Sequence, residues 1–436
     1  MQYSYDGGFL TLKKINYLKE GIQITSSLID DIMFLFEFRT KDTYFTRIGR
    51  CKMSFRNIIL FIINFVKKSL QLELDNFCDT ISDDGLNISK QAFSQARRKV
   101  SPKAFIHMLN KINKWYYEET PFNKYKGYRL LAIDGTVLEL SNTETLRNEF
   151  GYIENQNAKV ARARASALYD VENDMIITSQ ITHYRCGERE TAENLINQMI
   201  QLGTYNDLIL FDRGYPSGEI INFIESKKLS YLMRVSSGFF KAVVEAPDSD
   251  QIVEITHKKI NLKMRVIKFE LDSGIQEILV TNIFDSAFLI DDFKKLYFKR
   301  WGIEVKYNEM KNKLQIQNFT GETQISIEQD FYATMYLCNM VSFAKKDANT
   351  VIIENTKRKN LKYDYKVNTN ILVGKLKNTL ILMIITTNPW KRSKMLKYIQ
   401  KEIEKNIIPI RPGRAFPRRI TRTMRMENKM NKKRSL

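Results

Sequence analysis

Two short apolar runs, each ending in an aspartate with a glycine close behind, most constrain how this chain can fold. The runs are Tyr128–Asp134 and Asp207–Asp212. Continuous runs of this length are typical of strands covered on both faces, as in parallel sheets flanked by helices. In such sheets, polar side chains at the carboxyl ends of the strands line the ligand crevice. If the strands are parallel neighbours, the two carboxylates approach each other; the alternative is that each aspartate only forms a turn.

Strand-like and helical patterns alternate around these runs, which predicts an α/β (α+β) fold with a mixed sheet flanked by helices. Strands at Ala163–Asp170 and Met175–Tyr184 should form a hairpin. A two-residue alternation between about 231 and 285 predicts an antiparallel β insertion. The expected regions are a helical N-terminal region (1–123), a central α/β domain holding the insertion (124–345), a C-terminal helical region (346–410) and a basic tail (411–436).

A helical pattern from about 291 to 315 carries polar residues where a purely structural helix would carry apolar ones. At about 100° per residue, one face of about 60° collects an aromatic residue, two cations and a carboxylate. These residues are Tyr297, Arg300, Glu304 and Lys311, with Trp301 at the edge of the arc. The simpler interpretation is an exposed face with an ion pair between Arg300 and Glu304.

The charge of the chain predicts its partner. A formal net charge of +20 favours a polyanion, because Lys and Arg side chains that neutralise phosphates release counterions. A membrane surface would require an anchor, and the apolar runs are too short to span a bilayer. The N-terminus lacks the apolar segment of a signal peptide. The four cysteines and three histidines are scattered, which excludes a disulfide framework or a zinc site and favours a reduced, cytosolic compartment.

Two basic segments are candidates for DNA contact. Two helices are expected to meet at a tight turn near residue 99, with Arg97 and Arg98 at the corner. That arrangement suits a DNA-contacting unit, although cations also favour a solvated helix C-terminus. The tail from Arg411 to Leu436 holds ten Lys and Arg residues against one acid, which suits a phosphate backbone.

Three carboxylates from distant parts of the chain, without sulfur or imidazole ligands, match the requirements of hard divalent cations. We expect Asp134, Asp212 and Glu304 to hold two Mg²⁺ ions, for which Mn²⁺ can substitute. Two such ions promote in-line displacement at phosphorus. Arg300 and Lys311 can clamp phosphates, and Tyr297 and Trp301 can offer a hydrogen bond and a stacking face.

These motifs resemble those of the DDE transposases of bacterial insertion sequences, and specifically of the insertion-sequence-four family. The matching segments are Asp134-Gly-Thr, Asp212-Arg213-Gly-Tyr and the Tyr297/Arg300/Glu304/Lys311 signature. The resemblance extends to Gln91–Lys99 near one end of the chain and to Arg411–Arg418 near the other, and so covers most of it.

The resemblance implies an RNase H-like fold, with the aspartates on the first and fourth strands and the glutamate on the helix after the insertion. It implies Arg213 as a further DNA contact and dimeric action on double-stranded DNA, at terminal inverted repeats and at a target. The implied reactions are nicking, hairpin formation by the freed 3′-hydroxyl, hairpin opening and strand transfer. A bacterial cytoplasmic protein, associated with the nucleoid when bound to DNA, would follow.

Two other functions fit the same sequence. One is a catalytically silent DNA-binding protein, such as a repressor derived from an insertion sequence. The intact set of three acids argues against it. The other is an RNase H-like nuclease without strand transfer, which shares the site and differs only in its products.

Overall fold

The computed structural model describes residues 3–6, 9–12, 15–46, 53–81, 86–154, 156, 158–271, 274–357, 359, 361–377 and 379–411. The predicted basic tail lies outside these residues except for Arg411. The chain divides into two compact units. The first comprises residues 1–120, 139–162 and 310–436, and the second comprises residues 121–138 and 163–309.

The first unit is mostly helical. Its helices are α1 (Tyr17–Asp30), α2 (Ile32–Phe38), α3 (Phe55–Ile62), α4 (Leu70–Ile81), α5 (Lys90–Arg97), α6 (Lys103–Glu119), α7 (Glu144–Phe150), α13 (Gln324–Lys357), α14 (Thr369–Leu376), α15 (Thr379–Ile385) and α16 (Pro389–Glu404). Its short strands are β1 (Tyr3–Asp6), β2 (Phe9–Leu12), β4 (Tyr152–Glu154), β12 (Tyr365–Val367) and β13 (Ile407–Pro409).

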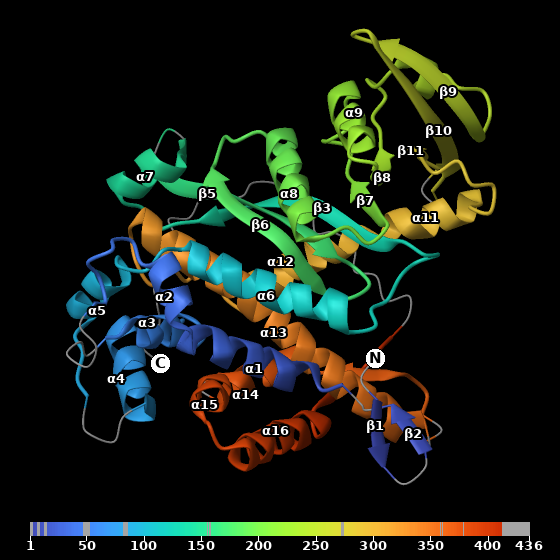
Figure 1. The fold of residues 1–436 in the computed structure, drawn as a ribbon. Coiled ribbons are helices and arrows are strands. Elements are labelled where there is room, and N and C mark those ends of the chain that lie inside the picture. Colours follow the sequence, from blue (N-terminus) through green and yellow to red (C-terminus); the bar gives the residue numbers. More distant parts are fainter. Residues whose placement is uncertain are drawn as a thin grey trace. The chain divides into compact units, whose positions relative to one another are not determined.

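Helix α13 is the centre of the first unit, with α1 and α6 packed along it (Figure 1). Asp347 of α13 accepts hydrogen bonds at 2.9 Å from the backbone N–H groups of both Tyr17 and Leu18. A carboxylate at a helix N-terminus satisfies orphan donors and favours the helix dipole. This contact therefore ties the start of α1 to α13.

The second unit contains a mixed sheet. Its elements are β3 (Arg129–Glu139), β5 (Lys159–Asp170), β6 (Met175–His183), α8 (Glu188–Leu202), β7 (Asp207–Phe211), α9 (Gly218–Ser226), β8 (Ser230–Arg234), α10 (Lys241–Val244), β9 (Asp250–His257), β10 (Ile260–Glu270), β11 (Gln276–Thr281), α11 (Ile290–Lys299) and α12 (Trp301–Asn312). Strands β3 and β5 and helix α12 each have one end in the first unit, where the start of β5 pairs with β4.

The sheet of the second unit runs in the order β6-β5-β3-β7-β8-β11-β10-β9. Strands β5 and β6 are antiparallel, whereas β3, β7 and β8 are mutually parallel. This order and direction of the first five strands define the RNase H-like fold expected from the sequence. The antiparallel strands β9, β10 and β11 form the insertion before the helix that carries Glu304 (Figure 1).

The two apolar runs are buried strands. Residues Leu130–Ile133 of β3 and Leu208–Phe211 of β7 have no exposed surface. Complete burial of consecutive residues requires cover on both faces of the sheet, because successive side chains point to opposite faces. The prediction that these runs are covered strands is confirmed.

The helix expected from about 291 to 315 is instead two helices, α11 and α12, with a break at Arg300. The backbone N–H of Arg300 bonds to the carbonyl of Tyr297 at 3.1 Å, which tightens the chain into a turn. Gly302 follows, and a Cβ there would lie 2.9 Å from Val171 Cγ1. A glycine lowers helix propensity and allows this close approach.

No helix among the described residues is long and apolar enough to cross a membrane.

Candidate active site

Asp134 and Asp212 lie at the same level on neighbouring strands, Asp134 within β3 and Asp212 directly after β7. The parallel register of β3 and β7 pairs Ala132 with Leu210, so each aspartate lies two residues beyond this pair. Each carboxylate accepts a hydrogen bond at 2.8 Å from a nearby glycine N–H, Asp134 from Gly135 and Asp212 from Gly214. The turn considered as an alternative is present only after Asp212, whereas Asp134 lies within β3, which continues to Glu139.

Glu304 lies in the first turn of α12 and is held by Arg300. The Nη2 of Arg300 donates to Glu304 Oε1 at 2.9 Å. The Arg300 side chain is only 7% exposed, whereas that of Glu304 is 35% exposed. The ion pair considered as the simpler interpretation is thus formed, but by a buried guanidinium rather than on a solvated face.

The pKa of Asp134 shows that the three acids share one electrostatic environment. Burial raises it from 3.8 to about 6; the Gly135 N–H and Arg300 oppose this shift, and Asp212 and Glu304 add to it. Desolvation and neighbouring negative charge both disfavour an ionised carboxylate. Arg300, Asp212 and Glu304 therefore lie near enough to Asp134 to affect its pKa, and all four residues belong to the second unit.

A cation is the group that would relieve this repulsion. The candidate ligand atoms are all carboxylate oxygens, which is the type of ligand that Mg²⁺ and Mn²⁺ prefer. Among the described residues, however, no three Asp, Glu, His or Cys side chains are close enough to hold one ion. The donor atoms are of the type that a divalent cation prefers, and ligation by all three acids requires at least one side chain to move.

Tyr297 and Trp301 flank Arg300. The Cζ of Arg300 lies 5.8 Å from the ring centre of Tyr297 and 5.7 Å from that of Trp301. Tyr297 is buried, and burial raises its pKa while Arg300 and Arg234 lower it. Tyr297 is thus buried beside Arg300, and its expected contact with DNA stays a prediction. Trp301 is 42% exposed, so it does not pack into the core.

Two tyrosines that the sequence did not single out reinforce the site. The hydroxyl of Tyr307 donates to the backbone carbonyl of Asp134 at 2.7 Å, which ties α12 to β3. Burial, followed by the charge of Asp134, raises the pKa of both Tyr307 and Tyr215 well above 10. Tyr307 falls about 20° from Arg300 on a helical projection, so helical periodicity alone could have identified it.

Lys306 is a further buried residue that the sequence did not single out. Its side chain is 2% exposed, and its Nζ lies 2.8 Å from Asp174 Oδ1 and 3.5 Å from Glu309 Oε1. A buried ammonium requires such partners. The sequence gives no sign that Lys306 is buried, because lysine side chains in folded proteins are usually exposed.

Arg213 and Lys311 occupy different surroundings. Arg213 is exposed directly after Asp212. Lys311, at the end of α12, belongs to the first unit, where burial lowers its pKa and Glu139 raises it.

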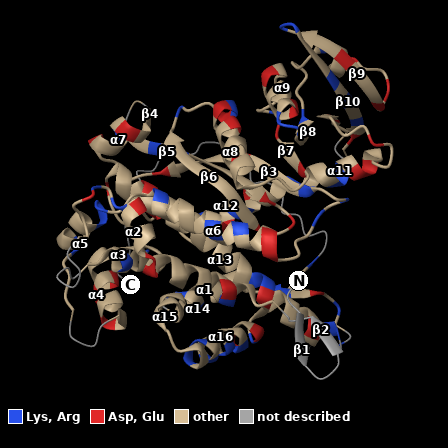
Figure 2. Ribbon diagram, viewed as in Figure 1, with Lys and Arg blue, Asp and Glu red and all other residues tan. Residues whose placement is uncertain are grey.

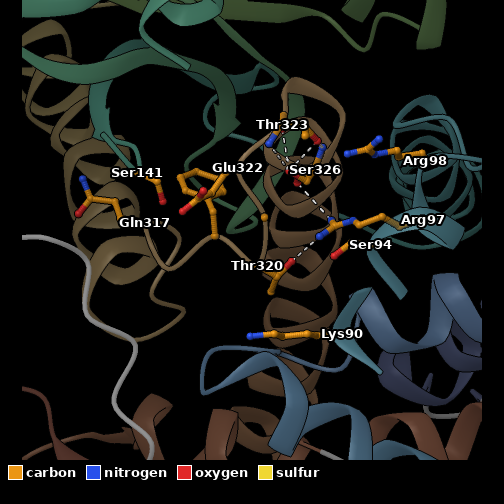
Figure 3. A pocket seen from close by; sticks show the side chains of 12 residues that line it. Lys90, Ser94, Arg97, Arg98, Ser141, Gln317, Thr320, Glu322, Thr323 and Ser326 are labelled. Atoms are coloured by element: carbon orange, nitrogen blue, oxygen red, sulfur yellow. Dashed lines mark hydrogen bonds between the residues drawn. The ribbon is translucent and has the colours of Figure 1, made fainter. Parts of the chain in front are cut away.

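Arg97 and Arg98 differ sharply in burial, which corrects the expectation that both contact DNA. Arg97 is 3% exposed and ion-paired with Asp330 at 2.7 Å. It also donates to Gln329 and Thr320, at 2.8 and 2.6 Å. This guanidinium is committed to joining α5 to α13 at the base of a polar pocket (Figure 3). Arg98 lines the same pocket and is exposed, so it alone of the two stays a candidate for DNA contact.

The strand order and the paired acids define an RNase H-like domain with a carboxylate site. Residues 125–340 match the family model for the transposase DDE domain. The chain is 23% identical over 276 residues to the transposase InsG of insertion sequence element IS4 from Escherichia coli K12. That match covers 59% of this chain and 61% of the relative's length. The resemblance to the insertion-sequence-four family is thereby confirmed.

A solved structure also resembles the chain at low similarity. It is a piggyBac transposase synaptic complex with hairpin DNA, with a TM-score of 0.47 and 10% identity. The match covers 92% of this chain and 87% of that one.

Proposed function

We propose that this protein is a DDE transposase that cleaves and joins DNA at the terminal inverted repeats of an insertion sequence. The observation that supports the proposal is that Asp212 and Glu304 lie near enough to Asp134 to raise its pKa. The family of residues 125–340 supports DNA as the substrate, and the net charge of +20 suits a polyanion.

Asp134, Asp212 and Glu304 would hold two Mg²⁺ ions, for which Mn²⁺ can substitute. When bound, the ions activate an attacking oxygen and stabilise the leaving oxygen at phosphorus. The three carboxylates supply the negative charge that attracts the ions, and Asp134 must be ionised to do so. With a pKa of about 6, it is mostly ionised at neutral pH even before any cation binds.

Arg300 would bind the phosphate next to the scissile bond. Its Nε is buried and has no hydrogen-bond partner among the described residues, while one terminal nitrogen bonds to Glu304. A guanidinium carries five N–H donors in a rigid fork suited to phosphate oxygens. We infer that a DNA phosphate takes up these donors and competes with Glu304 for Arg300, which would free the carboxylate to turn toward the two aspartates.

The other residues predicted to contact DNA differ in how exposed their side chains are. Arg98 and Arg213 are exposed and can reach a DNA backbone, whereas Tyr297 acts through Arg300. Lys311 would clamp a phosphate once its surroundings admit DNA. We further propose that the protein acts as a homodimer on paired DNA ends and associates with the bacterial nucleoid when bound to DNA.

Trp301 would stack on a base that leaves the helix when the DNA end forms a hairpin. Extruding a base costs a few kcal/mol, and an aromatic face returns about 1–3 kcal/mol of it. Because Trp301 is 42% exposed beside Arg300, its ring is available for this contact. The Trp301→Ala protein should still make the first nick but accumulate nicked ends without hairpins. A normal hairpin yield would refute the stacking role.

The overall proposal is tested with the full chain, Mg²⁺ and a plasmid that carries the DNA flanking the gene on both sides. A transposase cuts at both repeat ends and yields excised and joined products. A repressor derived from such an element retards the same DNA without cutting it. A nuclease without strand transfer cuts it and leaves no joined product.

A further inference from the structure

Helix α16 in the first unit presents an unusually basic face. Its exposed residues include Lys391, Lys394, Lys397 and Lys401, together with the aromatic rings of Trp390 and Tyr398. At about 100° per residue these six side chains fall within about 120° of the helix circumference. In Figure 2 much of the α16 ribbon is coloured blue, which marks its Lys and Arg residues.

The orientation of this face is fixed by the rest of the helix. Asn388 caps the N-terminus by accepting from the N–H groups of Trp390 and Lys391 at 2.9 and 3.2 Å, and Pro389 begins the first turn. Ile399 and Ile403 project from the opposite side and are buried, where α16 packs on α13, α14 and α15. The apolar side of α16 is therefore used in the core, and the basic side faces solvent.

These lysines keep their charge available. Among the described residues, no carboxylate forms an ion pair with Lys391, Lys394, Lys397 or Lys401, and Lys394 lies 5.5 Å from the ring centre of Trp390. The one acid on this side of the helix, Glu402, is already shared by Lys375 and Lys405, at 3.0 and 2.7 Å. Such a concentration of unneutralised charge raises the local concentration of an anionic partner.

We propose that this face of α16, defined by Lys391, Lys394, Lys397, Lys401, Trp390 and Tyr398, binds the phosphate backbone of double-stranded DNA without reading its sequence. The proposal rests on DNA being the partner, as proposed above, but concerns a surface outside the acid site. From Lys391 to Lys401 the helix rises about 15 Å. At one phosphate per about 3.4 Å of each strand, that length faces about four phosphates.

The geometry favours DNA over an anionic membrane surface. A helix that lies in a bilayer interface buries a wide apolar face at the level of the acyl chains. In α16 that face is occupied by the protein core, and only Trp390 and Tyr398, 70% and 54% exposed, are apolar on the free side. Isolated aromatic rings among lysines suit contacts with sugars and phosphates along a nucleic acid backbone.

The test replaces the four lysines of this face by glutamine in the full chain and measures binding to an unrelated DNA duplex as a function of salt. Each lost phosphate contact reduces the slope of log K against log salt by about 0.9, so the loss of four should lower the slope by about 3.6 and weaken binding about tenfold or more. A matched control replaces four exposed lysines scattered over other elements, Lys19, Lys111, Lys227 and Lys241. The control should change the slope by less than about 1.

Equal slopes for the two quadruple variants would overturn the proposal, since only total charge would then matter. Loss of binding to anionic phosphatidylserine vesicles with unchanged DNA binding would overturn it in favour of a membrane surface. If the quadruple variant melts at a lower temperature than the wild type, the pair Lys394→Gln/Lys401→Gln should still reduce the slope by about 2. A wild-type chain that binds no duplex would instead refute the function proposed for the whole protein.

Discussion

Replacing Asp134 by asparagine should stabilise the metal-free protein at neutral pH. In the folded protein, burial raises the pKa of this carboxyl from 3.8 to about 6, and Asp212 and Glu304 add to the effect. At about 1.4 kcal/mol per pH unit, the difference of about two units corresponds to about 3 kcal/mol. An amide of the same size carries no charge and so avoids this cost.

The sign follows from proton linkage. The folded state binds the Asp134 proton more tightly than the unfolded chain, so its contribution is fully present below pH 3.8 and is lost as pH rises through about 6. The free energy of unfolding of the wild type, relative to Asp134→Asn, should therefore fall by about 2–3 kcal/mol between pH 4 and pH 7.5. Urea unfolding of both proteins in chelator at several pH values measures this difference, because contributions from other groups cancel.

Adding Mg²⁺ at pH 7.5 supplies the complementary control. An ion that binds the folded state stabilises it by mass action. The wild type should gain stability and the asparagine variant should gain much less. If the two proteins keep the same difference at pH 4 and 7.5, or if Asp134→Asn is less stable at pH 7.5, the three acids do not share the environment described above.

Two further substitutions test how the helix that carries Glu304 is held. Gly302→Ala places a Cβ 2.9 Å from Val171 Cγ1, so it should cost about 1–3 kcal/mol in unfolding free energy, and Val171→Ala in the same chain should restore most of it. Lys306→Met removes the buried ion-pair partner of Asp174 and should lower the free energy of unfolding by about 3 kcal/mol. The control Lys263→Met, at an exposed lysine, should change it by less than about 0.5 kcal/mol. Denaturant unfolding measures both variants.

The sequence was sufficient for the sheet and the acids because both depend on local patterns. A continuous apolar run needs cover on both faces. The end of the run matches the end of the strand for Asp212 but not for Asp134, because β3 continues to Glu139. The register pairs Arg129 of β3 with Asp207 of β7, and each aspartate lies five residues beyond this pair, which puts Asp134 and Asp212 at one level.

What the sequence could not indicate depends on tertiary contacts. Helical periodicity continues through Arg300, but the close approach of Gly302 to Val171 accompanies a break there. Arg97 and Arg98 are both arginines, so the local sequence does not tell which one is buried. Arg97 is buried and pairs with Asp330, which lies far away in the chain. Lys306 is likewise buried beside an acid, Asp174, that lies far away in the chain.

Cleavage by single-acid variants is the most direct test of the proposed chemistry. Asp134→Ala, Asp212→Ala and Glu304→Ala should each abolish cleavage of the terminal repeats in Mg²⁺ and in Mn²⁺ while retaining binding to the same DNA. The matched control is Glu190→Ala, an exposed acid on α8 that should cleave at the wild-type rate. Wild-type cleavage by Glu304→Ala, or loss of cleavage in the Glu190 control alone, would contradict the assignment of the three acids.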